Sequence, residues 1–201
     1  MTLDVDDLDP DPIAQFRRWQ ADVEEAGLPE PTAMVLATAP AGDRAQPLGR
    51  HVLLRGVDER GFTWVSNSES RKGRHLAENP DAALIFPWFP IHRQVIVTGF
   101  VSAAPDDEAD AYFATRPRGS QLASWASEQS RPIPDRAWLE ARWAELDRRY
   151  EGRDVPRPPH WWMYRLVPDT IELWQQGEHR MHNRFLYERA GGTWTIARLA
   201  P

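Results

Sequence analysis

The sequence predicts a mainly β protein, an antiparallel barrel with α-helices packed against its outside. Strand-like segments follow one another along most of the 201 residues, and helical segments occur near the start and between groups of strands. A doubly wound sheet is not supported, because strands do not alternate with helices and no GxGxxG sequence follows a strand. The prediction is therefore one barrel with flanking helices.

The chain begins with an acidic segment followed by one helix. Residues 1–11 contain five Asp and few apolar side chains, so we expect them to lack fixed structure. From Pro12 onward, apolar residues recur at helical spacing for about four turns, and Gly27 predicts the end of this helix. Residues 12–201 suffice for one sizeable core and are few for two, so a single domain is expected.

Apolar or alternating runs bounded by turn residues predict the strands of the barrel. These runs are residues 33–39, 51–54, 61–65, 82–88 and 94–103, with three more strand-like stretches within residues 163–199. The first three runs form a predicted meander. Because arginines 50 and 55 flank the second run on what reads as one strand, they are expected to point to opposite faces.

Further helices and one loop are predicted between the strands. Helical spacing and capping residues predict helices at residues 70–79, 106–114 and 135–150. Residues 116–134 are rich in Arg, Ser, Gln and Pro but also carry apolar side chains that would anchor them. That composition is typical of a polar loop that binds a ligand.

Composition narrows the chemistry and the partners. The chain has no cysteine, which excludes disulfides, thiolate metal sites and a cysteine nucleophile, so redox chemistry would require a bound cofactor. A formal net charge of −6 disfavours nucleic acid and anionic membranes as partners. No apolar run reaches the roughly 20 residues of a spanning helix, and the first dozen residues are acidic, so we expect a cytoplasmic protein.

Basic and hydroxyl side chains gather where a strand meets a helix start, at Ser66, Ser70, Arg71 and Lys72. Free backbone N–H groups, hydroxyls and positive charge together suit a phosphate. Basic residues at a helix N-terminus oppose the helix dipole, so their presence is explained best by a bound anion. A solvated basic face is the alternative interpretation.

Two other segments carry candidate site residues. Tyr112, Arg116, Arg118 and Ser120 suit a second phosphate. The segment GEHRMHNR, residues 177–184, contains two histidines, but the intervening arginine would repel a cation and HExxH is absent, so no metal site is expected. Two phosphate sites suggest two phosphorylated small molecules, such as a cofactor and a substrate.

Eight segments resemble the pyridoxamine 5'-phosphate oxidase family, in order along residues 11–201. They are RHVLLRG, SESRKGRHLAENP, FPW, RQVIVTG, AYFATRPRGSQLASWASEQSRPI, VPRPPHW, IELWQQGEHRMHNRFLYER and RLAP. The resemblance implies an FMN-binding split barrel and a homodimer with FMN between the subunits. It also implies oxidation of pyridoxine or pyridoxamine 5'-phosphate to pyridoxal 5'-phosphate, with O2 as acceptor.

The resemblance further implies the roles of individual residues. One subunit would hold FMN through Arg50, His51, Val52, Leu53, Leu54, Arg55, Val65, Ser66, Arg71 and Lys72. The other subunit would complete that site through Gln94, Gln129, Ser130, Trp174 and Arg184. The substrate phosphate would be bound by Arg55, Tyr112, Arg116 and Ser120. Arg180 and His182 would cover the substrate ring beside the flavin, as the catalytic pair.

Four features depart from the family's usual pattern. Arg55 stands where a lysine is usual, and the two side chains are not interchangeable at a phosphate. Trp162 and Met163 stand where two glycines are usual, and Val65 where a tyrosine is common. The acidic residues 1–12 replace a basic arm that often closes over the substrate.

These departures leave two other functions open. One is a related FMN oxidase that acts on another small molecule, such as a reduced phenazine-type tricycle. The retained Tyr112, Arg116 and Ser120 argue against it, because a substrate without phosphate has no use for them. The other is a non-catalytic flavin or pyridoxal phosphate binding protein, against which the retained Arg180 and His182 argue.

Overall fold

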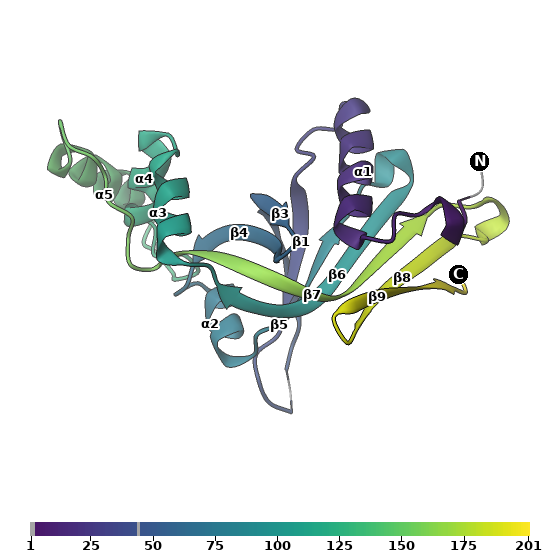
Figure 1. Ribbon diagram of the computed structural model, residues 1–201. Helices are drawn as coiled ribbons and strands as arrows, with labels where there is room; N and C mark the ends of the chain where they lie inside the picture. Colours follow the sequence, from purple (N-terminus) through teal and green to yellow (C-terminus); the bar gives the residue numbers. More distant parts are fainter. Residues whose placement is uncertain (1–2, 44) are drawn as a thin grey trace.

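The computed structural model describes residues 3–43 and 45–201 and confirms the predicted fold class. Nine strands form one antiparallel sheet that curls into a half-barrel, with helices on its outside (Figure 1). The strands are β1 Ala33–Thr38, β2 Leu48–Leu53, β3 Gly56–Asp58, β4 Gly61–Asn67, β5 Asp81–Phe86, β6 Arg93–Ala103, β7 Trp161–Gln175, β8 Asn183–Ala190 and β9 Thr193–Leu199. The α-helices are α1 Pro12–Glu25, α2 Arg71–Glu78, α3 Asp106–Ala114, α4 Arg118–Ala126 and α5 Arg136–Arg149. Single 3-10 turns are η1 Val5–Asp7, η2 Phe89–Ile91 and η3 Glu178–Arg180.

The long strand β7 divides the sheet into two parts. The strand order is β2-β1-β5-β6-β7-β4-β3, and β6 pairs with one edge of β7 along nearly its whole length. On the other edge, residues 161–166 pair with β4, whereas residues 170–175 pair with β8. The change of partner at this edge separates the barrel from the β8–β9 hairpin.

Helix α1 covers the barrel core, as its apolar spacing predicts. Asp11 caps the helix by accepting a hydrogen bond from the Ile13 amide at 2.9 Å. Phe16 is fully buried, and its ring centroid lies 4.9 Å from that of Phe62 and 4.8 Å from that of Phe86. Burial of one such ring contributes about 2–3 kcal/mol, so this aromatic cluster fixes α1 on the barrel.

The acidic N-terminal segment differs from its expected disorder in the part that is described. Leu8 is buried in the core cluster, and the Tyr187 hydroxyl donates to the Asp9 carbonyl at 2.7 Å. Asp4 caps η1 and lies 3.0 Å from an Arg198 nitrogen. Composition alone predicts no order here because the contacts come from the distant β8–β9 hairpin. Residues 1 and 2 lie outside the described residues.

The prediction of a polar loop over residues 116–134 is wrong for its first half, which forms α4. Pro117 directly precedes the helix, and Leu122 and Ala126, four residues apart, are buried. Gln121 is also buried, and its side-chain amide is satisfied there by donating to the Phe113 carbonyl at 3.0 Å. The helix is difficult to predict because most of its residues are polar or small and its buried side is short.

The predicted helix at residues 70–79 is confirmed as α2, with Ser70 as its N-cap. The Ser70 hydroxyl accepts from the Gly73 amide at 3.3 Å. Within residues 3–43 and 45–201, we find no helix with the length and apolar character that crossing a membrane requires.

Candidate functional site

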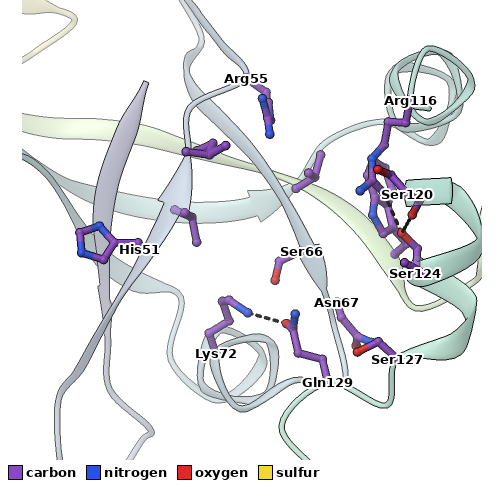
Figure 2. Close-up of a pocket in the computed structure, with 15 residues that line it drawn as sticks. His51, Arg55, Ser66, Asn67, Lys72, Arg116, Ser120, Ser124, Ser127 and Gln129 are labelled. Atoms are coloured by element: carbon purple, nitrogen blue, oxygen red, sulfur yellow. Dashed lines mark hydrogen bonds between the residues drawn. The ribbon is translucent and has the colours of Figure 1, made fainter. Parts of the chain in front are cut away.

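A cleft of about 430 Å³ opens between the β2–β4 part of the barrel and helices α2 and α4 (Figure 2). Its lining includes many of the residues predicted for the site, namely His51, Val52, Leu53, Arg55, Val65, Ser66, Lys72, Arg116, Ser120 and Gln129. Figure 2 shows Arg55 and Arg116 on one side of Ser66, and Lys72 with Gln129 on the other. The cleft therefore carries basic side chains in two groups.

Five lining residues were missed by the sequence analysis: Asn67, Ala123, Ser124, Ser127 and Trp161. Three of them lie on α4 or at its end, so recognising that helix would have revealed them. A second signal for the cleft was also missed. Of the 24 basic Lys and Arg residues in the chain, Lys72 is the only lysine and all the others are arginines. A single lysine among arginines indicates a position with its own requirement.

The first basic group surrounds Lys72 at the start of α2. The Lys72 ammonium donates to Gln129 Oε1 at 2.6 Å and to Ser70 Oγ at 3.3 Å. The Arg71 amide donates to Ser130 Oγ at 3.2 Å. Gln129 and Ser130 therefore lie beside Lys72 of their own chain, which corrects the expectation that the other subunit supplies them. The segment after α4 folds back onto α2, and a sequence gives no sign of that path.

The charge of Lys72 is poorly compensated. Burial, together with the smaller effect of the nearby Arg50 charge, lowers the pKa of Lys72 to about 8. Among the described residues, no carboxylate forms an ion pair with Lys72. A bound anion would stabilise the ammonium form, so this end of the cleft is suited to a phosphate.

Arg50 and Arg55 do not share a strand, contrary to the prediction. Strand β2 ends at Leu53, so Arg55 lies beyond it and lines the cleft. Arg50 does not line the cleft; its Nη1 donates to the Leu36 carbonyl at 3.0 Å and to Thr38 Oγ1 at 2.7 Å on β1. Burial lowers the pKa of Arg50, and the charge of Arg71 acts in the same direction. Arg50 thus adds positive potential near Lys72.

The second basic group consists of Arg55 and Arg116. The Arg116 guanidinium donates to Ser124 Oγ at 2.7 Å and lies 5.2 Å from the centroid of the Trp161 ring. Burial lowers the pKa of Arg116; Tyr112 opposes this shift and the charge of Arg55 adds to it. Two neighbouring cations without a carboxylate between them form a second place for an anion.

Two predicted residues lie close to the cleft without lining it. Tyr112 stacks on Trp161 with ring centroids 6.3 Å apart, and the Arg55 guanidinium lies 5.9 Å from the Tyr112 centroid. The Leu54 side chain is buried in the barrel core, so only its backbone can face a ligand. Leu54 falls there because β2 has already ended.

The other predicted residues form a separate cluster at the far end of β7, which we call the far group. Gln94, Trp174 and Arg184 are direct neighbours across β6, β7 and β8, so their side chains share one face of the sheet. The His182 ring lies 4.8 Å from the Trp174 ring. Thirteen residues of strand separate Trp174 from Trp161 at the cleft, about 40 Å of extended chain. The group therefore lies at the opposite end of β7 from the cleft of its own chain.

The loop between β7 and β8 holds the predicted catalytic pair. Arg180 is exposed and has a φ of 64°, in the left-handed region that non-glycine residues rarely adopt. His182 Nδ1 accepts a hydrogen bond from the Gly177 amide at 3.2 Å. Strained backbone of this kind occurs often at functional sites.

The curled half-barrel and its basic cleft define a class of protein, a split β-barrel with a candidate anion-binding cleft. Comparison with known proteins specifies the family. The family model described as pyridoxamine 5'-phosphate oxidase matches residues 21–149, and that of the pyridoxine 5'-phosphate oxidase C-terminal dimerisation region matches residues 161–201. The chain belongs to the pyridoxamine 5'-phosphate oxidase family.

Curated relatives are similar over the full length. The pyridoxine/pyridoxamine 5'-phosphate oxidase of Paraburkholderia phymatum is 53% identical over 201 residues, covering 100% of this chain and 93% of the relative. The protein of the same name from Rubrobacter xylanophilus is 54% identical over 196 residues, covering 98% and 89%. Such identity over whole chains supports a shared fold.

Solved structures agree with the fold. PhzG from Burkholderia lata 383, in complex with tetrahydrophenazine-1-carboxylic acid, has a TM-score of 0.92 at 34% identity and covers 100% of this chain and 98% of its own. A pyridoxamine 5'-phosphate oxidase-related, FMN-binding protein from Nostoc punctiforme has a TM-score of 0.75 at 16% identity, with 100% coverage of both chains. The second likeness concerns the fold alone.

Proposed function

We propose that the protein is an FMN-dependent oxidase that converts pyridoxine and pyridoxamine 5'-phosphate to pyridoxal 5'-phosphate. The observation that supports this best is the cleft with two uncompensated basic groups, as two phosphorylated molecules require. The full-length relatives named for this activity agree with it. The C-terminal match to a dimerisation region supports a homodimer.

The residues near Lys72 fit FMN. An ammonium without a carboxylate partner suits the FMN phosphate, and Ser66 and Gln129 offer neutral polar groups beside it. Arg50 adds charge nearby, where its contacts to β1 hold it. When bound, FMN supplies the acceptor for the hydride that leaves the substrate.

The residues near Arg116 fit the substrate phosphate. Arg55 and Arg116 bring two guanidinium groups to one place, and Ser120 adds a hydroxyl on the first turn of α4. Anchoring the phosphate fixes the direction of the substrate ring, so the reacting carbon is held in one orientation. Arg180 and His182 would approach that carbon from the second subunit and hold its oxygen or nitrogen.

The overall reaction balances without a metal. With the alcohol substrate, two electrons and two protons pass to O2, which gives the aldehyde and hydrogen peroxide. With the amine substrate, water is also consumed and ammonia is released. The part of the protein is therefore to bind the cofactor and the substrate and to orient the reacting carbon toward the flavin.

A second copy of the chain would bring a far group to each cleft, because the two lie at opposite ends of β7 within one chain. Val35, Ile85 and Ile96 are direct neighbours across β1, β5 and β6, and all three side chains are only half-buried. Phe100 on β6 is 50% exposed. An apolar sheet face of this kind supports burial against another copy, which would bring Trp174 and Arg184 to the partner's cleft.

The direct test of function is turnover by the purified protein. We expect a yellow protein with the visible spectrum of FMN, and equal amounts of pyridoxal 5'-phosphate and peroxide when pyridoxamine 5'-phosphate is added in air. A yellow protein that leaves this substrate unchanged would contradict the proposal and favour a reduced phenazine-type substrate, such as the one that PhzG was crystallised with. A colourless protein that does not take up FMN would contradict the cofactor.

Affinity for FMN is expected to depend on pH through Lys72. The phosphate binds the ammonium form, whose pKa is about 8 in the free protein, so affinity falls about tenfold per pH unit above this pH. Because Lys72 is the only lysine, labelling lysine with 13C at Cε reports its titration directly by NMR. A free-protein pKa near that of an exposed lysine, about 10.4, would contradict this assignment.

Lys72→Met provides the matched variant for the pH dependence. It is expected to bind FMN more weakly at pH 7 and to lose the dependence between pH 8 and 10, because methionine has a similar length but no charge. A variant with the same pH dependence as the unmodified protein would show that another group titrates.

A further inference from the structure

Arg116 is held in the cleft by neutral groups. Its Nη1 lies 2.7 Å from Ser124 Oγ, and its guanidinium lies 5.2 Å from the Trp161 ring centroid and 5.8 Å from that of Phe113. Among the described residues, no carboxylate forms an ion pair with it. A carboxylate in place of the hydroxyl would neutralise the guanidinium, whereas these partners fix its position and leave its charge available to a ligand.

The Ser124 hydroxyl has a fixed direction. Its single hydrogen is donated to the Ser120 carbonyl at 2.9 Å, one turn earlier in α4. The oxygen lone pairs therefore face Arg116, which donates to them. Ser124 acts only as an acceptor toward the guanidinium, so the position of α4 sets the position of Arg116.

The aromatic side of this arrangement is also fixed. Trp161 stacks against Tyr112 at 6.3 Å and meets the edge of Phe113 at 5.0 Å. The guanidinium thus has a rigid ring on one side and a fixed hydroxyl on another. Figure 2 shows Arg116 reaching toward Ser124 and Ser120 at the edge of the cleft.

We propose that Ser124 is a positioning residue that aims Arg116 at the phosphate of the substrate and thereby contributes to specificity for phosphorylated molecules. This inference rests on the proposed function, because it assigns the Arg116 end of the cleft to the substrate. Ser124 acts through Arg116 and has no part in the redox step. Its loss should weaken substrate binding and leave both FMN and the chemistry unchanged.

The test is the variant Ser124→Ala in the FMN-loaded protein. We expect KM for pyridoxamine 5'-phosphate to rise about tenfold with kcat unchanged, because a hydrogen bond to a charged group is lost. FMN affinity and thermal stability should stay the same. Ser124→Thr keeps the hydroxyl and should restore KM. Thr193→Ala, which removes an exposed hydroxyl that donates to the Ala190 carbonyl at 2.9 Å, is the matched control and should behave as the unmodified protein.

A binding measurement tests the same inference without turnover. Ser124→Ala should bind pyridoxal 5'-phosphate about tenfold more weakly, and its affinity for unphosphorylated pyridoxal should not change. Equal affinity of Ser124→Ala and the unmodified protein for pyridoxal 5'-phosphate would overturn the inference. So would a joint loss of FMN affinity and stability that Ser124→Thr does not restore, since that indicates a purely structural role. If the unmodified protein binds no pyridoxal 5'-phosphate, the proposed function itself fails.

Discussion

The double variant Arg180→Ala, His182→Ala is expected to lower kcat by about two to three orders of magnitude while FMN stays bound. Both residues lie in the loop between β7 and β8, next to the row that holds Gln94, Trp174 and Arg184. The double change leaves that row intact. In the proposed dimer it removes the only two predicted side chains that would touch the reacting end of the substrate.

Measurement of FMN content and single-turnover reduction separates binding from chemistry in this variant. The matched control is His179→Asn, since His179 has a φ of 53° and asparagine tolerates that conformation. The control should retain turnover. If the double variant also retains turnover, the catalytic assignment of Arg180 and His182 is wrong. If it loses FMN, the pair serves the cofactor instead of the substrate.

The variant Gly61→Ala is expected to lower the free energy of unfolding by about 3–5 kcal/mol. Gly61 begins β4 with a φ of 123°, which L-residues rarely adopt. A Cβ there would lie 2.0 Å from the Leu166 carbonyl oxygen on β7. The backbone of one of the two strands must move, and β4 lines the cleft through Val65 and Ser66.

Gly42→Ala is the control for this variant. Gly42 has a φ of 108° but no heavy atom near the added Cβ, so only the backbone strain is shared between the two changes. We expect it to cost about 1–2 kcal/mol. Urea unfolding at one fixed protein concentration measures both variants, because the stability of a dimer depends on concentration. Equal decreases in the free energy of unfolding for Gly61→Ala and Gly42→Ala would show that the close approach of Gly61 to β7 does not contribute to stability.

The sequence predicted most of the secondary structure because the signals are local. Spacing of apolar residues and a capping serine are enough to locate α2 and most strands. The path of residues 127–134 depends on tertiary contacts, which explains why Gln129 and Ser130 were placed on the wrong subunit. The row of Gln94, Trp174 and Arg184 depends on strand register, and periodicity does not determine which residues of three strands face each other.

The departures from the family pattern have local structural explanations. Met163 is buried against α3, in contact with the cluster that contains Phe113, and so fills space outside the cleft. Trp162 is 40% exposed, and its indole nitrogen donates to the Pro159 carbonyl at 3.0 Å. Neither side chain lines the cleft of its own chain. Arg55 keeps a positive charge at the cleft, next to Tyr112.

In the proposed dimer, each site combines the cleft of one copy with the far group of the other. Complementation between two inactive variants distinguishes this arrangement from a site within one chain. One carries Lys72→Met with Arg116→Ala, and the other carries Arg180→Ala with His182→Ala. The two chains are co-expressed with different affinity tags, and the mixed dimer is purified through both.

The mixed dimer contains one site without any substitution and one with all four. We therefore predict about half of the unmodified dimer's turnover of pyridoxamine 5'-phosphate, although each variant alone is inactive. A purified mixed dimer that stays inactive, while a tagged dimer of unmodified chains turns over, would rule out a site shared between two copies. It would mean that the cleft and the loop between β7 and β8 serve the same copy.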